Sequence, residues 1–155
     1  MKVTRPEDCH RSYTEAFNSG DIAALLDHYE RDATFVPQPG QTASGHSAIG
    51  EALQRYQAVG KMAAETRYCV PSGDVALASA SWQIKGSSQD GEPVEVQGTS
   101  ADLLRRQRDG RWLLVVDHPW GSSAARSPVP DGDEARTQAL ITGGGDEHVH
   151  ANGLV

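Results

Sequence analysis

The residues of this chain that can transfer protons cluster near the end of its apolar part. Asp117 and His118 directly follow the run Trp112–Val116, whose five consecutive apolar residues are typical of a buried strand. Asp102 lies in a second strand pattern, where a charged carboxylate is costly unless it is paired or neutralised. A neutral carboxyl donates a hydrogen bond and an ionised one accepts a proton, so these residues point to acid–base chemistry. The alternative is that Asp102 lies at a strand edge, in water or bonded to a neighbouring side chain.

Asp117 and His118 cannot both enter one pocket from a regular strand, because adjacent strand residues point to opposite faces. Pro119 favours a bulge or a strand end at this place. His118 is the preferred candidate base, since histidine titrates near neutral pH. Asp117 can orient a ring or act as the base itself. The alternative is that both residues close the strand at the surface, against solvent or a dimer partner.

Aromatic side chains accompany these groups. Tyr13 lies on the apolar face of a helical pattern, where its hydroxyl either faces a ligand or bonds within the core. We expect Trp120 to wall the mouth of a pocket. Further candidates for lining it, which can equally be core residues, are Phe17, Tyr56 and Trp82.

Helices are expected before residue 60. Thr4 and Glu7 have the spacing of a capping box, Pro6 suits a first helical turn, and residues 18–20 end this helix. Asp21 caps a second helix, whose expected apolar stripe is Ile22, Leu25, Leu26 and Tyr29. A third helix is expected over about residues 47–59. We expect His46 in a loop, and His10 and His28 on helices as solvated or capping residues.

Strands follow the helices. Residues 33–36 form a short early strand, and period-two patterns predict others over about 62–70, 75–85 and 94–108. Asp109-Gly110 is a strong hairpin signal before the strand that begins at Trp112. Helices followed by an antiparallel meander predict an α+β fold with the helices on one face of a curved sheet.

Composition excludes several classes of partner. The chain has 155 residues and a formal charge of -7, which disfavours nucleic acid and anionic membranes. No apolar run approaches bilayer length, and the beginning of the chain lacks the apolar core of a signal peptide. Cys9 and Cys69 have no partner motif, so we expect reduced thiols in a cytoplasmic protein.

The pattern dissolves after residue 121. Residues 122–155 are rich in Pro, Gly, Ser and acidic side chains and are expected to be disordered, with a docking peptide as the alternative. The motif His-Val-His at 148–150 has no fixed geometry there to hold a metal. No histidines stand four residues apart, and no strand and helix frame the glycines at 143–145, so we expect neither metal nor cofactor.

Three stretches together resemble the NTF2-like superfamily, especially its SnoaL-like and ketosteroid-isomerase-like branches. They are YTEAFNSGDIAALLDHYERDATFV, SGHSAIGEAL and SADLLRRQRDGRWLLVVDHPWG, within a domain expected over residues 1–121. The resemblance implies a cone, in which three helices and a curved antiparallel or mixed sheet enclose an apolar pocket. It places Tyr13 and Asp102 at the tyrosine and the protonated aspartate of the isomerase oxyanion hole, where an apolar site raises the pKa of the aspartate. Pro37 stands where the isomerase has its base, so that mechanism cannot be transferred whole.

The functions implied belong to more than one class, because this fold carries many activities. The first is a small acid–base enzyme, an isomerase, cyclase, dehydratase or epoxide-opening enzyme, acting on a hydrophobic metabolite, with natural-product biosynthesis as its context. The second is a module that binds a hydrophobic ligand without chemistry, and the third is a dimerisation scaffold. The resemblance implies a homodimer that pairs through the outer sheet face, where Leu77 and Leu103 would need cover.

Overall fold

The computed structural model describes residues 2–123, so the tail expected from residue 122 and the His-Val-His motif lie almost entirely outside the described residues. The helices are a short 3₁₀ helix, Pro6–Asp8, followed by α1 (Cys9–Ser19), α2 (Ile22–Leu26) and α3 (Gly45–Val59). The strands are β1 (Tyr29–Phe35), β2 (Ala43–Ser44), β3 (Lys61–Ser72), β4 (Val75–Ser87), β5 (Pro93–Thr99), β6 (Ala101–Arg106) and β7 (Trp112–His118). None of the helices described is long and apolar enough to span a bilayer.

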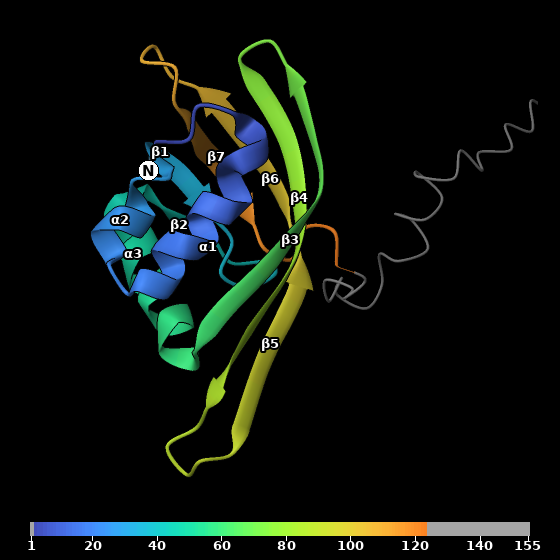
Figure 1. Cartoon of the computed structure of the whole chain (residues 1–155). Coiled ribbons are helices and arrows are strands. Elements are labelled where there is room, and N and C mark those ends of the chain that lie inside the picture. Colours follow the sequence, from blue (N-terminus) through green and yellow to red (C-terminus); the bar gives the residue numbers. More distant parts are fainter. Residues whose placement is uncertain (1, 124–155) are drawn as a thin grey trace, which may run out of the picture. The chain divides into compact units, whose positions relative to one another are not determined.

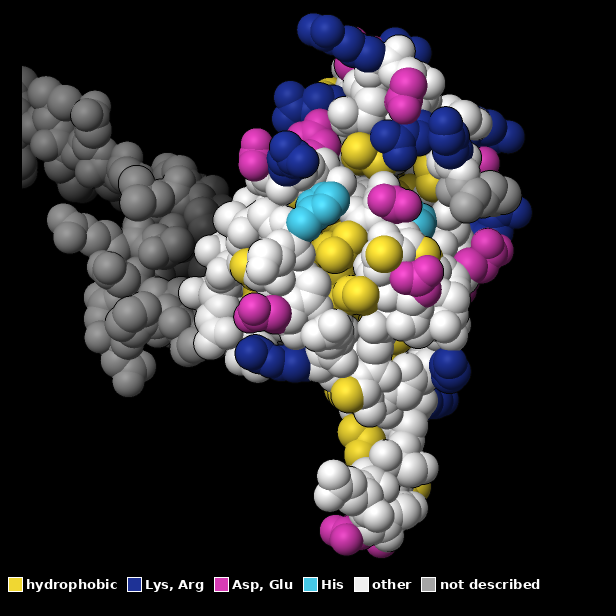
Figure 2. Space-filling view, turned by 90° about the vertical axis from the view of Figure 1, so that its left-hand side faces the viewer, with side chains coloured by type: hydrophobic (Ala, Val, Ile, Leu, Met, Phe, Trp, Pro, Cys, Tyr) yellow, Lys and Arg dark blue, Asp and Glu magenta, His cyan; other side chains and the backbone are white. Residues whose placement is uncertain are grey.

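One curved mixed sheet carries the helices on one of its faces (Figure 1). The strand order is β2-β1-β7-β6-β4-β3, and β5 pairs with the far half of β4. All the strand pairs are antiparallel except β1 with β7, which run parallel. Seen from the helical side, the β4–β5 hairpin projects beyond the helices (Figure 2). The α+β prediction is therefore confirmed.

Strand β4 separates the core from the outer face by simple alternation. Ala76, Ala78 and Trp82 are buried toward the helices, whereas Leu77 is exposed on the other face. Ser79 departs from this pattern, since alternation predicts an outward position but the residue is fully buried. Its hydroxyl donates to the carbonyl of Ser100 at 2.5 Å, which satisfies the buried polar group.

The stretch expected as one strand over residues 94–108 is two strands, β5 and β6, separated at Ser100. The break occurs where the chain leaves the projecting half of β4, which pairs with β5, for the half that pairs with β6. The backbone N–H of Ser100 still donates to Ala80 at 2.9 Å. The long strand β4 thus pairs with two shorter strands, β5 and β6, and Ser100 lies between them.

The helix ends agree with the sequence in part. Asp21 caps α2 by accepting from the backbone N–H groups of Ala23 and Ala24 at 3.0 and 3.3 Å, and Gly20 ends α1 in the left-handed conformation. The predicted capping box of Thr4 and Glu7 is wrong, because the first helical segment is a 3₁₀ turn that has no side-chain cap. The helical assignment of Tyr29 is also wrong. Helix α2 ends at Leu26, and Tyr29 opens strand β1.

Gly86 should be irreplaceable where the end of α3 meets β4. A Cβ atom at this position would lie 1.7 Å from the carbonyl oxygen of Val59, so the backbone must shift to accept it. We expect Gly86→Ala to lower the free energy of unfolding by about 3 kcal/mol, the upper end of overpacking costs. Urea denaturation measures the loss, and Ser87→Ala, at the exposed next residue, is the control. Equal stability of the two variants would contradict the close approach.

Candidate active site

A cavity lies between α1, α3 and the helix-facing side of the sheet. Its walls are mostly apolar and come from Phe17, Phe35, Leu53, Tyr56, Met62 and Trp82. Its polar side chains come from α1 and from the β6–β7 pair, and include His10, Tyr13, Ser100, Asp102 and Asp117. The free volume of the cavity is about 60 Å³, which is room for only a few water molecules. It is therefore a narrow apolar site with chemistry concentrated in a few groups.

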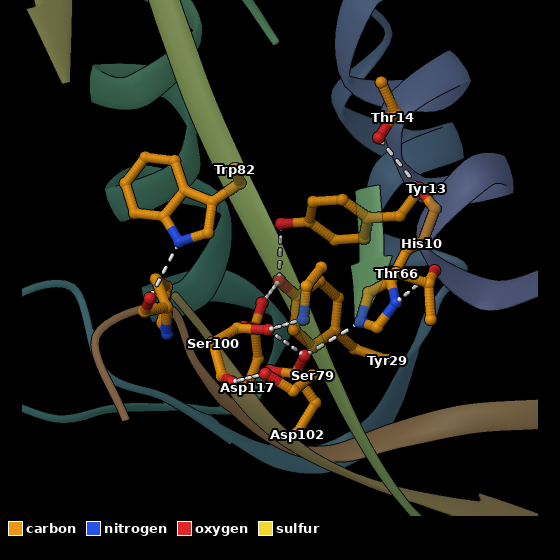
Figure 3. Close-up of polar contacts among 12 residues, drawn as sticks. His10, Tyr13, Thr14, Tyr29, Thr66, Ser79, Trp82, Ser100, Asp102 and Asp117 are labelled. Carbon is orange, nitrogen blue, oxygen red and sulfur yellow. Dashed lines mark hydrogen bonds and ion pairs between the residues drawn. The ribbon is translucent and has the colours of Figure 1, made fainter. Parts of the chain in front are cut away.

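Asp102 is buried and held by two side chains (Figure 3). His10 Nε2 lies 2.9 Å from Asp102 Oδ2, and the Ser100 hydroxyl donates to the same oxygen at 2.5 Å. The other ring nitrogen of His10 lies 3.0 Å from the hydroxyl of Thr66 on β3, at the solvent-exposed edge of the site. Asp102 Oδ1, by contrast, is buried and has no hydrogen-bond partner among the described residues.

Asp117 is held by a chain of two tyrosines. The Tyr29 hydroxyl donates a short hydrogen bond to Asp117 Oδ2, and the Tyr13 hydroxyl lies 2.8 Å from the Tyr29 hydroxyl. Because the Tyr29 proton is committed to Asp117, Tyr13 must be the donor to Tyr29. Burial, and next the negative charge of Asp117, raise the pKa of both tyrosines well above the ordinary value. Both therefore remain neutral hydrogen-bond donors.

The two carboxyls face each other across neighbouring strands. Asp102 of β6 and Asp117 of β7 are directly opposed in the antiparallel register, and both are buried. Burial, followed by the charge of Asp102, raises the pKa of Asp117 well above its usual range. Both effects favour the protonated form of Asp117, because burial and a neighbouring carboxylate each disfavour its negative charge.

His118 does not reach the cavity, which corrects its preference over Asp117. Strand β7 has a register shift between Leu114 and Val116. Beyond it Asp117 is buried on the cavity side, whereas the adjacent His118, paired with Ala101, points to the opposite face. Trp120 is not a lining residue either. Its indole N–H donates to the carbonyl of Pro37 at 3.1 Å, and its ring packs edge to face on Trp82 at 5.0 Å. Trp120 therefore supports the wall that Trp82 forms.

Three polar residues of the site were missed in the sequence, namely His10, Tyr29 and Ser100. His10 was expected in solvent or at a cap, yet it has the spacing of a shared helix face with Tyr13 and Phe17. That spacing is the signal that could have found it. For Tyr29 and Ser100 no sequence signal exists, because their roles depend on where β1 begins and where β5 ends.

Pro37, which stands where the resemblance to the isomerase would place a base, contributes a backbone carbonyl that has a structural role. Pro37 accepts hydrogen bonds from the Tyr56 hydroxyl and from the Trp120 indole, and the Trp82 indole donates to the carbonyl of Pro119 at 2.7 Å. These bonds fasten the chain around Pro37 and Pro119 to the aromatic wall. This end of the cavity is therefore apolar in character, and its polar atoms are already paired.

Comparison with known proteins identifies the fold. A model of the SnoaL-like domain family matches residues 10–115. A comparison with curated proteins gives no match. A ketosteroid isomerase-like protein from Erwinia carotovora atroseptica aligns with a TM-score of 0.64 and 24% identity, over 73% of this chain and 90% of the other.

Two further solved structures have the same architecture. An NTF2-like superfamily protein from Salmonella enterica serovar Typhimurium aligns with a TM-score of 0.62 and 18% identity, over 81% of this chain and 93% of the other. A proposed dehydratase of the NTF2-like family from Streptomyces avermitilis aligns with a TM-score of 0.57 and 20% identity, over 71% and 88%. At these identities the likeness shows the fold alone.

The raised pKa of Asp117 predicts a distinctive pH dependence of stability. The stabilisation from its bound proton is fully present below the ordinary aspartate pKa of about 3.9, and it is lost as the pH rises through the raised folded-state pKa. Asp117→Asn mimics the protonated acid and removes this dependence. We expect the free energy of unfolding of wild type minus variant to fall with rising pH, by at most about 1.4 kcal/mol per unit.

Urea denaturation at a series of pH values from 4 to 8 measures this difference. Asp109→Asn is the matched control, because hydrogen bonds from the backbone and side chain of Arg111 lower the pKa of Asp109. Stability from a lowered pKa is lost only as the pH falls below the ordinary aspartate pKa of about 3.9, so the control difference should stay nearly constant from pH 4 to 8. Parallel curves for wild type and Asp117→Asn would contradict a proton held on Asp117.

Proposed function

The chain belongs to the SnoaL-like domain family of the NTF2-like superfamily, and from this premise we propose that it is a cofactor-independent acid–base enzyme. Its substrate is an uncharged hydrophobic small molecule of the kind made in natural-product biosynthesis. The observation that carries the proposal is the buried pair of Asp102 and Asp117, directly opposed on neighbouring strands beside an apolar cavity, with the pKa of Asp117 raised. Such a pair supplies a base and an acid at neighbouring atoms.

In the proposed reaction Asp102 is the base. Its Oδ1 atom, which has no donor among the described residues, removes a proton from a carbon beside a carbonyl group. Asp117 gives its proton to the carbonyl oxygen, so the C–H bond breaks, an O–H bond forms and an enol results. The hydrogen bond from Tyr29, strengthened by Tyr13, stabilises the charge that Asp117 then carries.

The adjacent carboxyls allow the site to reset itself. In an isomerisation, Asp102 returns its proton to another carbon and the enol returns its proton to Asp117. In a dehydration, Asp117 protonates the departing hydroxyl to release water, and the proton on Asp102 then passes to Asp117. Aldol-type cyclisation and epoxide opening need the same two groups.

The lining supports an uncharged substrate. Among the described residues that line the cavity none is lysine or arginine, whereas two are aspartates. An anionic ligand would be desolvated without a cation to pair with it, which is costly. Neutral carbonyl compounds with flat apolar bodies fit the aromatic edges of Phe35, Tyr56 and Trp82.

A second candidate function is binding without chemistry. It is favoured by the small free volume of the cavity, about 60 Å³, which requires the walls to move before a sizeable substrate can enter.

We also propose a cytoplasmic location, because Cys9 and Cys69, the two cysteines of the chain, are both free thiols.

Activity should depend on the carboxyl pair and not on the neighbouring histidine. Wild-type protein, Asp102→Asn, Asp117→Asn and the control His118→Gln are each incubated with source-cell extract, and mass spectrometry follows all metabolites. We expect wild type and the control to consume one metabolite. Each asparagine variant should consume it at least about 100-fold more slowly. A metabolite that all four proteins retain and none consumes would exclude the enzyme and establish the binding function.

The outer sheet face supports the proposal of a homodimer. Val70, Leu77, Leu103 and Val116 form one row across β3, β4, β6 and β7 in the strand register. Val70 and Leu77 are 56% and 49% exposed, which leaves apolar surface to cover.

We expect light scattering after size exclusion to give the mass of a dimer for wild type and of a monomer for Leu77→Lys. A lysine on this face would have to be desolvated in the interface. Asp90→Lys, in the turn between β4 and β5, is the control that introduces the same side chain away from the row. A wild-type monomer would contradict the homodimer, and a dimeric Leu77→Lys variant would place the interface elsewhere.

A further inference from the structure

The geometry points to Ser100 as a positioning residue that decides which carboxyl of the pair carries the shared proton. By committing its hydroxyl proton to Asp102, Ser100 keeps Asp102 ionised and leaves the proton on Asp117. The inference deepens the proposed function, and rests on it for its catalytic consequence, because it explains why the acid and the base are arranged in this order. The proton position itself can be measured without a substrate.

The hydroxyl of Ser100 is an obligatory donor. The side chain is buried, and its oxygen accepts the backbone N–H of Ala80 at 3.0 Å. A hydroxyl has a single proton, and here Asp102 Oδ2 at 2.5 Å is the acceptor that takes it. If Asp102 Oδ2 carried a proton and donated it to Ser100, the hydroxyl proton of Ser100 would lose this acceptor.

His10 is the second donor to the same oxygen. An ionised Asp102 requires the proton of the imidazole on Nε2, 2.9 Å from Oδ2, and the hydroxyl of Thr66 then satisfies the bare Nδ1 at 3.0 Å. With two donors, Asp102 Oδ2 has no room for a proton of its own. A proton shared with Asp117 can therefore sit only on the side of Oδ1, which has no donor among residues 2–123.

The two carboxyls differ in the donors that reach them. Asp102 Oδ2 accepts two hydrogen bonds, from Ser100 and His10, whereas Asp117 Oδ2 accepts one from the Tyr29 hydroxyl. Hydrogen bonds to a carboxylate stabilise the charged form, so the charge settles on the better-supplied group. Removal of the Ser100 donor leaves one on each side and should move the proton toward Asp102.

Backbone hydrogen bonds fix the position of Ser100. The residue occupies the break between β5 and β6, where its N–H donates to the Ala80 carbonyl and its own carbonyl accepts from the Ser79 hydroxyl at 2.5 Å. These backbone contacts fix the residue to β4 independently of its hydroxyl. Figure 3 shows Ser79, Ser100 and both carboxyls together at the polar end of the site. The hydroxyl can therefore be removed while the backbone stays anchored.

Carbon-13 NMR of labelled aspartate side chains tests the inference at pH 7. In wild type we expect the carboxyl carbon of Asp117, assigned by its loss in Asp117→Asn, to resonate as a protonated acid. In Ser100→Ala the population ratio of proton on Asp117 to proton on Asp102 should fall at least roughly tenfold, the effect of one charge-assisted hydrogen bond. Ser100→Thr keeps the hydroxyl and should restore the wild-type signals.

Ser79→Ala is the structural control. It removes a hydrogen bond to the backbone of Ser100 but leaves both donors of Asp102, so its carboxyl signals should match wild type. Wild-type signals in Ser100→Ala would overturn the inference and leave the pair intact. Two ionised carboxyls in wild type would instead overturn the proposed function itself. If Ser100→Ala does not fold, Ser100→Cys, with a weaker donor, gives the same comparison in a smaller step.

Discussion

The structure depends on one electrostatic constraint, which is that two carboxyls are buried side by side on paired strands. Asp102 and Asp117 face each other across β6 and β7, away from solvent, and such a pair cannot carry two negative charges. We propose that a single shared proton resolves the conflict and makes the groups unequal. The donors from His10 and Ser100 on one side, and from Tyr29 on the other, stabilise that inequality.

The topology brings these donors together from distant parts of the chain. The parallel pairing of β1 with β7 places Tyr29 beside the strand that carries Asp117. Helix α1 lies across the sheet and contributes Tyr13 and His10, which bond to Tyr29 and Asp102. The register of β3 shifts just after Thr66, the residue that meets the outer nitrogen of His10. Such irregularities redirect side chains at sites that a regular sheet could not build.

The sequence predicted the architecture well and the site in part, for reasons visible in particular residues. The alternation of β4 and the hairpin at Asp109 follow from local periodicity, so the meander could be predicted. Tyr29 was misassigned because its spacing from Leu25 and Leu26 continues the helical stripe, although the helix stops at Leu26. The choice between Asp117 and His118 depended on where β7 bulges. The register shift lies between Leu114 and Val116 and places Asp117 on the cavity side, and its position is set by the neighbouring strand rather than by the residues of β7 alone.

Neutron diffraction from the fully deuterated protein tests the central claim most directly, because it locates the proton between the two carboxyls. The account predicts a single deuteron there, bound to Asp117, with the Ser100 and His10 deuterons both directed at Asp102 Oδ2. Two bare carboxylates, or a deuteron on each, would contradict the account. Either result would leave the site without the neighbouring base and acid on which the proposed chemistry depends.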